Sequence, residues 1–255
     1  MKKQVLAVST FIIFMMPVIS HAIGFEFALG GWSQSPGGDL SYKLLADTDK
    51  LDLENDLKYD DASRVFGRLK IDMPLLIPNV YLMATKMNFD GIGRKNTNFK
   101  FGDITFTQNV DFYSEVTLDH YDIALYYGIP FVSTASAGLL NIDVGLNLRV
   151  IDFSAKIRQE TLSKEESESF TLPVPMVFVG VQVKPIERLS IEGEARVVSY
   201  GGNSLYSLIG RARVNVFAGL FAAGGYRYDG IVIDEENVDV DISFSGPFLE
   251  AGFQF

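Results

Sequence analysis

The feature that most constrains the fold is an alternation of apolar and polar side chains with a period of two residues. In residues 139–150, apolar side chains occupy every second position and polar or small ones lie between them. The same alternation recurs in residues 64–73, 189–197 and 249–255. Because successive side chains of a strand point to opposite faces, this pattern indicates β-strands between two unlike environments. Helical periodicity is scarce, so the sequence predicts an all-β fold.

The N-terminal segment reads as a secretory signal peptide. Lys2 and Lys3 precede an apolar run over residues 5–16, and Ser20-His21-Ala22 forms a small-x-small cleavage site. An uncleaved anchor is the alternative. We therefore divide the chain into a signal peptide, residues 1–22, and one exported domain, residues 23–255. No later stretch approaches the roughly 18 apolar residues of a transmembrane helix.

The connections between the predicted strands alternate between short turns and long loops. Long connections are expected at about 35–63, 90–113, 152–172 and 232–244. An outer-membrane β-barrel has this alternation, because its periplasmic turns are short and its external loops are long. Closure also pairs every backbone group within the bilayer. The sequence predicts a closed antiparallel up-and-down transmembrane β-barrel of about ten strands, with eight or twelve as alternatives, located in the cell outer membrane. The expected strands are 24–34, 64–73, 79–89, 114–129, 139–151, 173–184, 188–200, 204–217, 219–231 and 245–255.

Aromatic residues gather at the ends of the predicted strands, as interfacial girdles require. Phe253 and the terminal Phe255, within an alternating segment, are typical of the signal read by the outer-membrane assembly machinery. The predicted girdle comprises Tyr81, Phe89, Tyr126, Tyr127, Phe131, Tyr200, Tyr206, Tyr226, Tyr228 and Phe255.

Composition removes several classes of function. The chain has 255 residues, no Cys, and a net charge of −10 from 22 basic and 32 acidic residues. Without Cys there are no disulfides, thiolate metal sites or cysteine nucleophiles, and an acidic chain lacks the footprint of a nucleic-acid binder. The acidic loops 35–63 and 232–244 are interpreted as solvated, although carboxylates can also hold Ca²⁺ or bridge through it to lipopolysaccharide. We expect no cofactor and no metal site, a monomer, and partners limited to outer-membrane lipid, lipopolysaccharide and the assembly machinery.

Several segments resemble a family of small proteobacterial outer-membrane β-barrels with no established activity. The resemblance covers most of the chain after residue 22, and its most specific element is the proline-rich turn at residues 73–80. It implies a barrel in the outer membrane and supplies no catalytic residues. The segments that carry it are Asn55-Asp56-Leu57, Met73-Pro74-Leu75-Leu76-Ile77-Pro78-Asn79-Val80, Ala124-Leu125-Tyr126-Tyr127, Pro173-Val174-Pro175-Met176, Gly225-Tyr226-Arg227 and Gly246-Pro247-Phe248.

Strand parity places a balanced set of charges inside the predicted barrel. Unpaired charges are costly in an apolar medium, so these side chains should pair across strands. They form either a plug or the constriction of a narrow porin-like pore, and ten strands enclose little more space than side chains fill. The predicted lumen set is Glu26, Arg68, Lys70, Asp72, Lys86, Asp122, Asp143, Arg149, Glu192, Glu194, Arg196, Arg211, Arg213, Arg227, Asp229 and Glu250.

One histidine lies after the signal segment, and it defines the enzymatic alternative. His120 and Asp122 share the predicted lumen face and could act as a general base on water. No nucleophile elbow or repeated acidic pair accompanies them, so we expect no catalytic residues. The leading hypothesis is a non-enzymatic barrel with a structural role or limited passage or binding of a small solute. The alternatives are a barrel hydrolase (protease or lipid-modifying) using His120 and Asp122, and a soluble secreted barrel that carries an apolar ligand.

Overall fold

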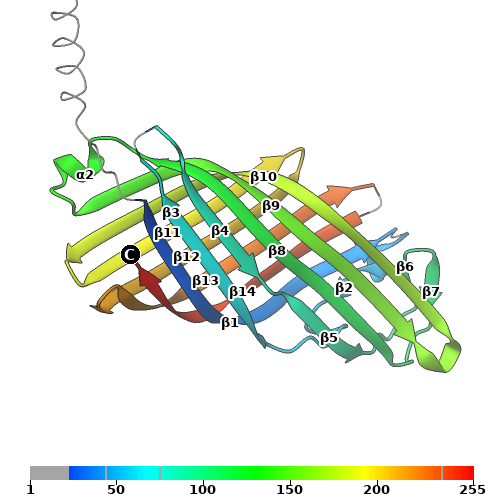
Figure 1. The fold of residues 1–255 in the computed structure, drawn as a ribbon. Helices are drawn as coiled ribbons and strands as arrows, with labels where there is room; N and C mark the ends of the chain where they lie inside the picture. The colour runs from blue at the N-terminus through cyan, green and yellow to red at the C-terminus, as the bar shows by residue number, and fades with distance from the viewer. Residues whose placement is uncertain (1–22, 44, 75, 237) are drawn as a thin grey trace, which may run out of the picture.

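The computed structural model describes residues 23–43, 45–74, 76–236 and 238–255, which form one closed antiparallel β-barrel (Figure 1). The predicted signal peptide lies outside the described residues. Ten strand positions make the barrel wall, with β4 and β5 sharing one position beside β8. The wall strands are β1 (Gly24–Tyr42), β3 (Ala62–Asp72), β4 (Asn79–Thr85), β5 (Asn88–Gly93), β8 (Phe112–Gly128), β9 (Leu140–Gln159), β10 (Lys164–Ile186), β11 (Leu189–Tyr200), β12 (Asn203–Phe217), β13 (Leu220–Glu235) and β14 (Val238–Gln254).

The remaining elements are short and lie in the connections. None of the helices in the described part of the chain is long and apolar enough to cross a membrane. These elements are η1 (Asp47–Asp49), β2 (Leu51–Asp52), β6 (Phe99–Phe101), β7 (Ile104–Phe106), α2 (Val132–Ala135) and η2 (Glu160–Leu162).

The first and last strands close the barrel. β1 pairs with β14 from Glu26 opposite Gln254 to Tyr42 opposite Val238. At the end of this seam, Phe25 and Phe255 exchange two backbone hydrogen bonds of 2.9 Å and their rings stack at 5.4 Å. Closure of the sheet on itself removes the long free edge that an open sheet would present to the bilayer. The predicted fold class is confirmed.

The alternation of the strands changes phase at one height of the barrel. In β9, the outward side chains are apolar up to Val150 and polar from Asp152 onward, while the inward ones change from Arg149 to Ile151. β8 changes at the same level, because Asp119 lies opposite Asp152. An apolar outer surface suits acyl chains and a polar one suits water. This level therefore marks the outer surface of the membrane.

The long outer loops predicted at 152–172 and 232–244 are wrong, because both segments are mostly strand. β9 and β10 are joined only by residues 160–163, and β13 continues to Glu235 while β14 begins at Val238. Above the membrane the outward side chains become polar, so the apolar alternation that we used to predict strands stops before the strands end. The paired strands themselves continue.

The predicted aromatic girdle is partly wrong. Tyr81, Phe89 and Tyr126 are buried inside the barrel. Tyr127 and Tyr226 are about half exposed on the outer surface. Parity, rather than nearness to a strand end, decides which aromatic side chains meet lipid.

Candidate functional site in the barrel interior

A first layer of ion pairs crosses the barrel near its periplasmic end. Arg68 donates to Glu250 through Nε at 3.0 Å and through a terminal nitrogen at 2.8 Å, and it also binds Glu26. Arg211 binds the same Glu250 at 3.2 Å and reaches Glu194. These residues come from five different strands and are buried. Carboxylates shared between two guanidinium groups compensate one another's burial.

A second charged layer lies next to the first and contains the candidate catalytic pair. Arg149 binds Asp122 through two hydrogen bonds of 3.0 Å, and Arg227 binds Asp229 at 2.7 Å. His120 donates through Nδ1 to the carbonyl of Leu118 at 3.0 Å, and its Nε2 lies 2.9 Å from Arg227 as the acceptor. Both His120 nitrogens are therefore engaged within the buried network.

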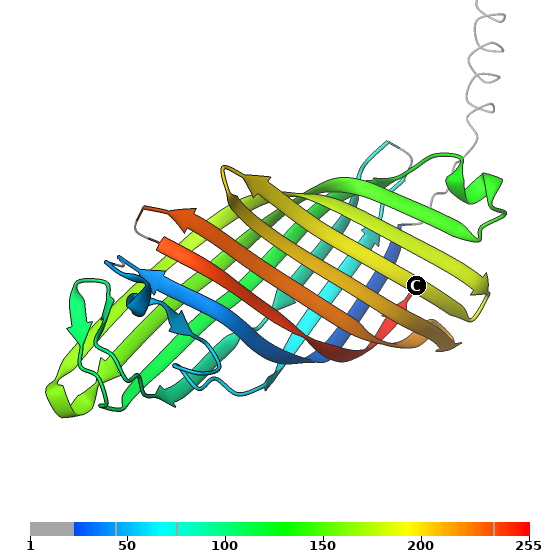
Figure 2. The same cartoon turned by 180° about the vertical axis from the view of Figure 1, so that it is seen from behind.

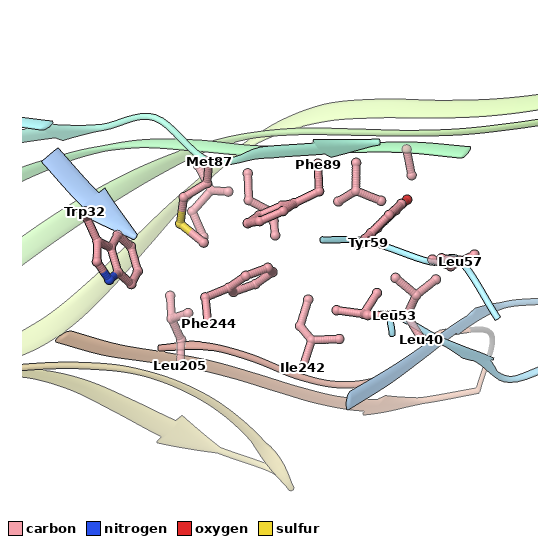
Figure 3. Close-up of a cluster of buried hydrophobic side chains, with 14 of the residues drawn as sticks. Trp32, Leu40, Leu53, Leu57, Tyr59, Met87, Phe89, Leu205, Ile242 and Phe244 are labelled. Atoms are coloured by element: carbon pink, nitrogen blue, oxygen red, sulfur yellow. The ribbon is translucent and has the colours of Figure 1, made fainter. Parts of the chain in front are cut away.

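Toward the cell surface the barrel interior becomes apolar. Figure 3 shows Trp32, Met87, Phe89, Ile242 and Phe244 pointing toward the axis from opposite walls. The rings of Phe89 and Phe244 stack at 5.1 Å. Arg227 joins the two regions, since its guanidinium lies 4.4 Å from the Trp32 ring. The prediction of a charged lumen describes only the membrane-embedded half.

The connection between β1 and β3 folds into this apolar half. Leu51, Leu53, Leu57 and Tyr59 are each at most 5% exposed, although the loop is acidic. They pack beside Leu40, as Figure 3 shows for most of them. The outer mouth is therefore filled by the chain's own inward loop, whose described residues are 43 and 45–61. A signal for this was present, because apolar residues recur at 51, 53, 57 and 59 within the acidic segment.

Two glycines of β5 let the inward loop lie directly against the barrel wall. A Cβ at Gly93 would lie 2.1 Å from the carbonyl oxygen of Asp56, and one at Gly91 would lie 2.4 Å from that of Leu57. Lys95 then fastens the loop from the next turn by a 2.8 Å ion pair to Asp56. Backbone approach this close excludes any side chain.

Asp49 fastens the start of the inward loop outside the membrane. Its carboxylate accepts backbone hydrogen bonds from Leu45 at 2.7 Å, Ala46 at 3.1 Å and Lys100 at 2.7 Å. Burial by itself would raise the pKa of Asp49, but these three donors outweigh it and hold the pKa below its usual value. The ionised carboxylate thus joins the loop to β6.

The periplasmic end contains a polar vestibule of about 280 Å³. Asp72 and Asp143 line it from β3 and β9, and Lys70 reaches from it to Glu194 at 3.3 Å. The first layer of ion pairs forms its inner end. The vestibule can admit water and small polar solutes from the periplasmic side.

The sequence-predicted site residues fall into three groups. The lumen charges within the two layers are buried together, whereas Asp72 and Asp143 lie at the vestibule. The prediction that Lys86 faces the lumen is wrong. Its side chain points outward and pairs with Asp119, because Lys86 lies on the opposite parity to Thr85 and Met87, which are buried. Phe253 lies on the outer surface beside Phe255, at a ring distance of 5.6 Å. Among the residues described, no three acidic or histidine side chains gather as a metal site would require.

Comparison with known proteins agrees on the fold. No protein-family model matches the sequence, and no curated protein matches it. The structure is similar to that of the outer membrane protease OmpT from Escherichia coli, with a TM-score of 0.52 and 11% identity, covering 94% of this chain and 99% of that one. It also matches the translocator domain of the autotransporter NalP from Neisseria meningitidis (TM-score 0.48, 10% identity, covering 100% of this chain and 94% of that one). A third match is Ail, the attachment invasion locus protein of Yersinia pestis (TM-score 0.37, 10% identity, covering 91% and 99%).

The fold and its outer surface define the class of the protein. It is an outer-membrane β-barrel, since a closed antiparallel barrel with an apolar outward belt suits a bilayer. A soluble carrier would require the reverse arrangement, with charged side chains outside at mid-height. In the described strands the charged side chains at this level are buried. At these levels of identity the similarity defines the fold and leaves the activity to the site itself.

Proposed function

We propose that this protein is a closed, non-enzymatic barrel that anchors a packed β-structure at the cell surface and conducts no solute. The observation that supports this best is the filled interior, in which two charged layers are followed by an apolar core and the inward loop. The cavities beside Glu250 and beside His120 measure about 10 Å³ each, which is room for about one water molecule. A pore requires a continuous hydrated path.

The proposed lack of catalysis is supported by the surroundings of the histidine. A general base needs a free lone pair within reach of a substrate proton. In this barrel the Nε2 of His120 accepts from Arg227, and Asp122 is held by Arg149 and by Asn147 at 2.7 Å. Both side chains are at most 3% exposed. The pair is better suited to holding strands together than to meeting a substrate.

Planar-bilayer recording of the purified full-length barrel tests the closed state. We expect no stepwise conductance from the wild type. A variant in which a short Gly-Ser linker replaces residues 43–61 should also remain closed, because both charged layers persist beneath the missing loop. Regular conductance steps from the wild type would contradict the proposal. Steps from the loop variant alone would show that the inward loop, and not the charged layers, provides the seal.

A further inference from the structure

The outer half of β10 has an unpaired edge. β10 pairs with β9 from Lys164 to Val183, but its register with β11 begins only at Val177. β11 ends at Tyr200, where the turn to β12 follows at once. Figures 1 and 2 show that the β9–β10 hairpin extends far beyond the short β11–β12 hairpin. Within the described part of the chain, no other strand pairs with residues 164–176.

Two prolines indicate which backbone groups face the open side. In an antiparallel pair, alternate residues direct their N–H groups to opposite neighbours. Pairing with β9 continues in register through Pro173 and Pro175, so the N–H positions of odd-numbered residues fall on the side away from β9. The free donors therefore belong to Glu165, Ser167, Ser169 and Thr171. The prolines themselves leave the part of the edge nearest the bilayer without donors.

The side chains beside this edge are apolar and exposed. Phe170 and Leu172 have the inward parity, yet they are 48% and 44% exposed because the β11–β12 hairpin is too short to cover them. Phe153 stacks on Phe170 at 4.7 Å, and Tyr200 at the end of β11 is 87% exposed. An extended segment laid along β10 would cover this surface with every second side chain.

Acidic side chains outnumber basic ones around the open side, since residues 164–172 contain three glutamates and one lysine. Glu168 lies on β10 and is exposed. Across the short hairpin, Asn203 of β12 binds the side chain of Glu235 at 2.6 Å and the backbone N–H of Asp234 at 2.8 Å. An anionic lipopolysaccharide headgroup would be repelled here, and a second copy of β10 would oppose like charges. A basic segment has the complementary charge.

We propose that residues 164–172 of β10 bind an extended, basic segment of a partner protein as an added β-strand, with alternate apolar side chains covering Phe170 and Leu172. Main-chain hydrogen bonds supply the affinity in such strand addition, and the side-chain pockets supply the selectivity. This inference rests on the proposed function, because it assigns the displayed β-structure a class of partner.

Fluorescence anisotropy with synthetic peptides tests the proposal on the intact barrel in detergent micelles. The probe is a set of labelled peptides of roughly nine residues that alternate Lys with Val, Phe or Leu, the length matching the free edge. The variant Ser167→Pro/Ser169→Pro removes two donors from the open edge. Like Pro173 and Pro175, both new prolines have odd numbers, so the hydrogen bonds to β9 are kept. It should weaken binding roughly tenfold or more, because two backbone hydrogen bonds are lost. The matched variant Ser167→Ala/Ser169→Ala keeps both donors and should bind like the wild type.

Three results would overturn the proposal. They are equal binding by the proline and alanine variants, equal binding of peptides whose backbone nitrogens are methylated at alternate residues, and binding of no peptide in the set. Displacement of a bound peptide by lipopolysaccharide vesicles in the absence of divalent cations would likewise assign the edge to lipid. The outcome is independent of conductance, so peptide binding by a barrel that also conducts ions would refute only the closed state.

Discussion

Replacement of Glu250 by Gln should destabilise the barrel more than any surface charge change of the same size. Glu250 accepts three hydrogen bonds from Arg68, between 2.8 and 3.2 Å, and one of 3.2 Å from Arg211. Glutamine keeps the shape but removes the charge, and its amide nitrogen would face a guanidinium that can only donate. Breaking a buried ion pair in this way costs about 3–5 kcal/mol of unfolding free energy. We expect about 3 kcal/mol, because the remaining oxygen of Gln still accepts.

The single tryptophan makes the measurement direct. Trp32 is fully buried in the barrel interior, so its fluorescence reports unfolding in urea from detergent micelles. The matched control is Glu165→Gln on the β9–β10 hairpin, where the exposed pair to Lys156 at 3.0 Å should contribute less than about 1 kcal/mol. If Glu250→Gln unfolds within about 1 kcal/mol of the wild type, the charged layers are not the stabilising network described here.

Three further predictions concern the inward loop and the histidine. Gly93→Val should displace the loop and expose it to trypsin, because the new side chain would meet the Asp56 carbonyl, whereas Gly193→Val, with open space around it, should not. The pKa of Asp49 is lower in the folded state, so its stabilisation of the loop is complete above the unfolded pKa and is lost as the pH falls through the folded one. Hydrogen exchange of the loop, corrected for intrinsic rates, should therefore accelerate below about pH 4, and Asp49→Asn should accelerate it already at pH 7. Finally, His120→Ala should leave hydrolysis of protease and lipase substrates unchanged and keep the heat-dependent gel mobility; a specific loss of hydrolysis would revive the enzymatic alternative.

The closed barrel could be predicted from the sequence because alternation is a local property. In each membrane-spanning segment, the alternation shows which side chains face lipid and which face the interior. Strands that are consecutive in the sequence then pair with each other, because most connections are short. Parity also assigned Arg68, Arg149 and Glu250 to the interior, where they lie. The prediction was wrong at Lys86, which has the outward parity. It pairs with Asp119, at the level where outward side chains become polar, so its charge did not indicate the interior.

The partners within the interior could not be predicted in the same way. Arg68 and Glu250 are 182 residues apart and meet only because the barrel closes between β1 and β14. Close backbone contacts were equally hidden. Gly246 appeared as one glycine among many, yet a Cβ there would lie 1.9 Å from the carbonyl oxygen of Ser33. Such constraints depend on which strand lies opposite, and a single sequence does not contain that information.

The change of phase in the alternation carries more information than either half alone. Below the membrane surface the strands are charged inside and apolar outside, and above it they are apolar inside and polar outside, without any break in the β8–β9 register. In β9 the change falls between Arg149 and Ile151 on one parity and between Val150 and Asp152 on the other. The upper half thus has the pattern of a water-soluble β-structure with its own core. Such a structure can be stable without a pore, and it carries the open edge of β10 to the cell surface.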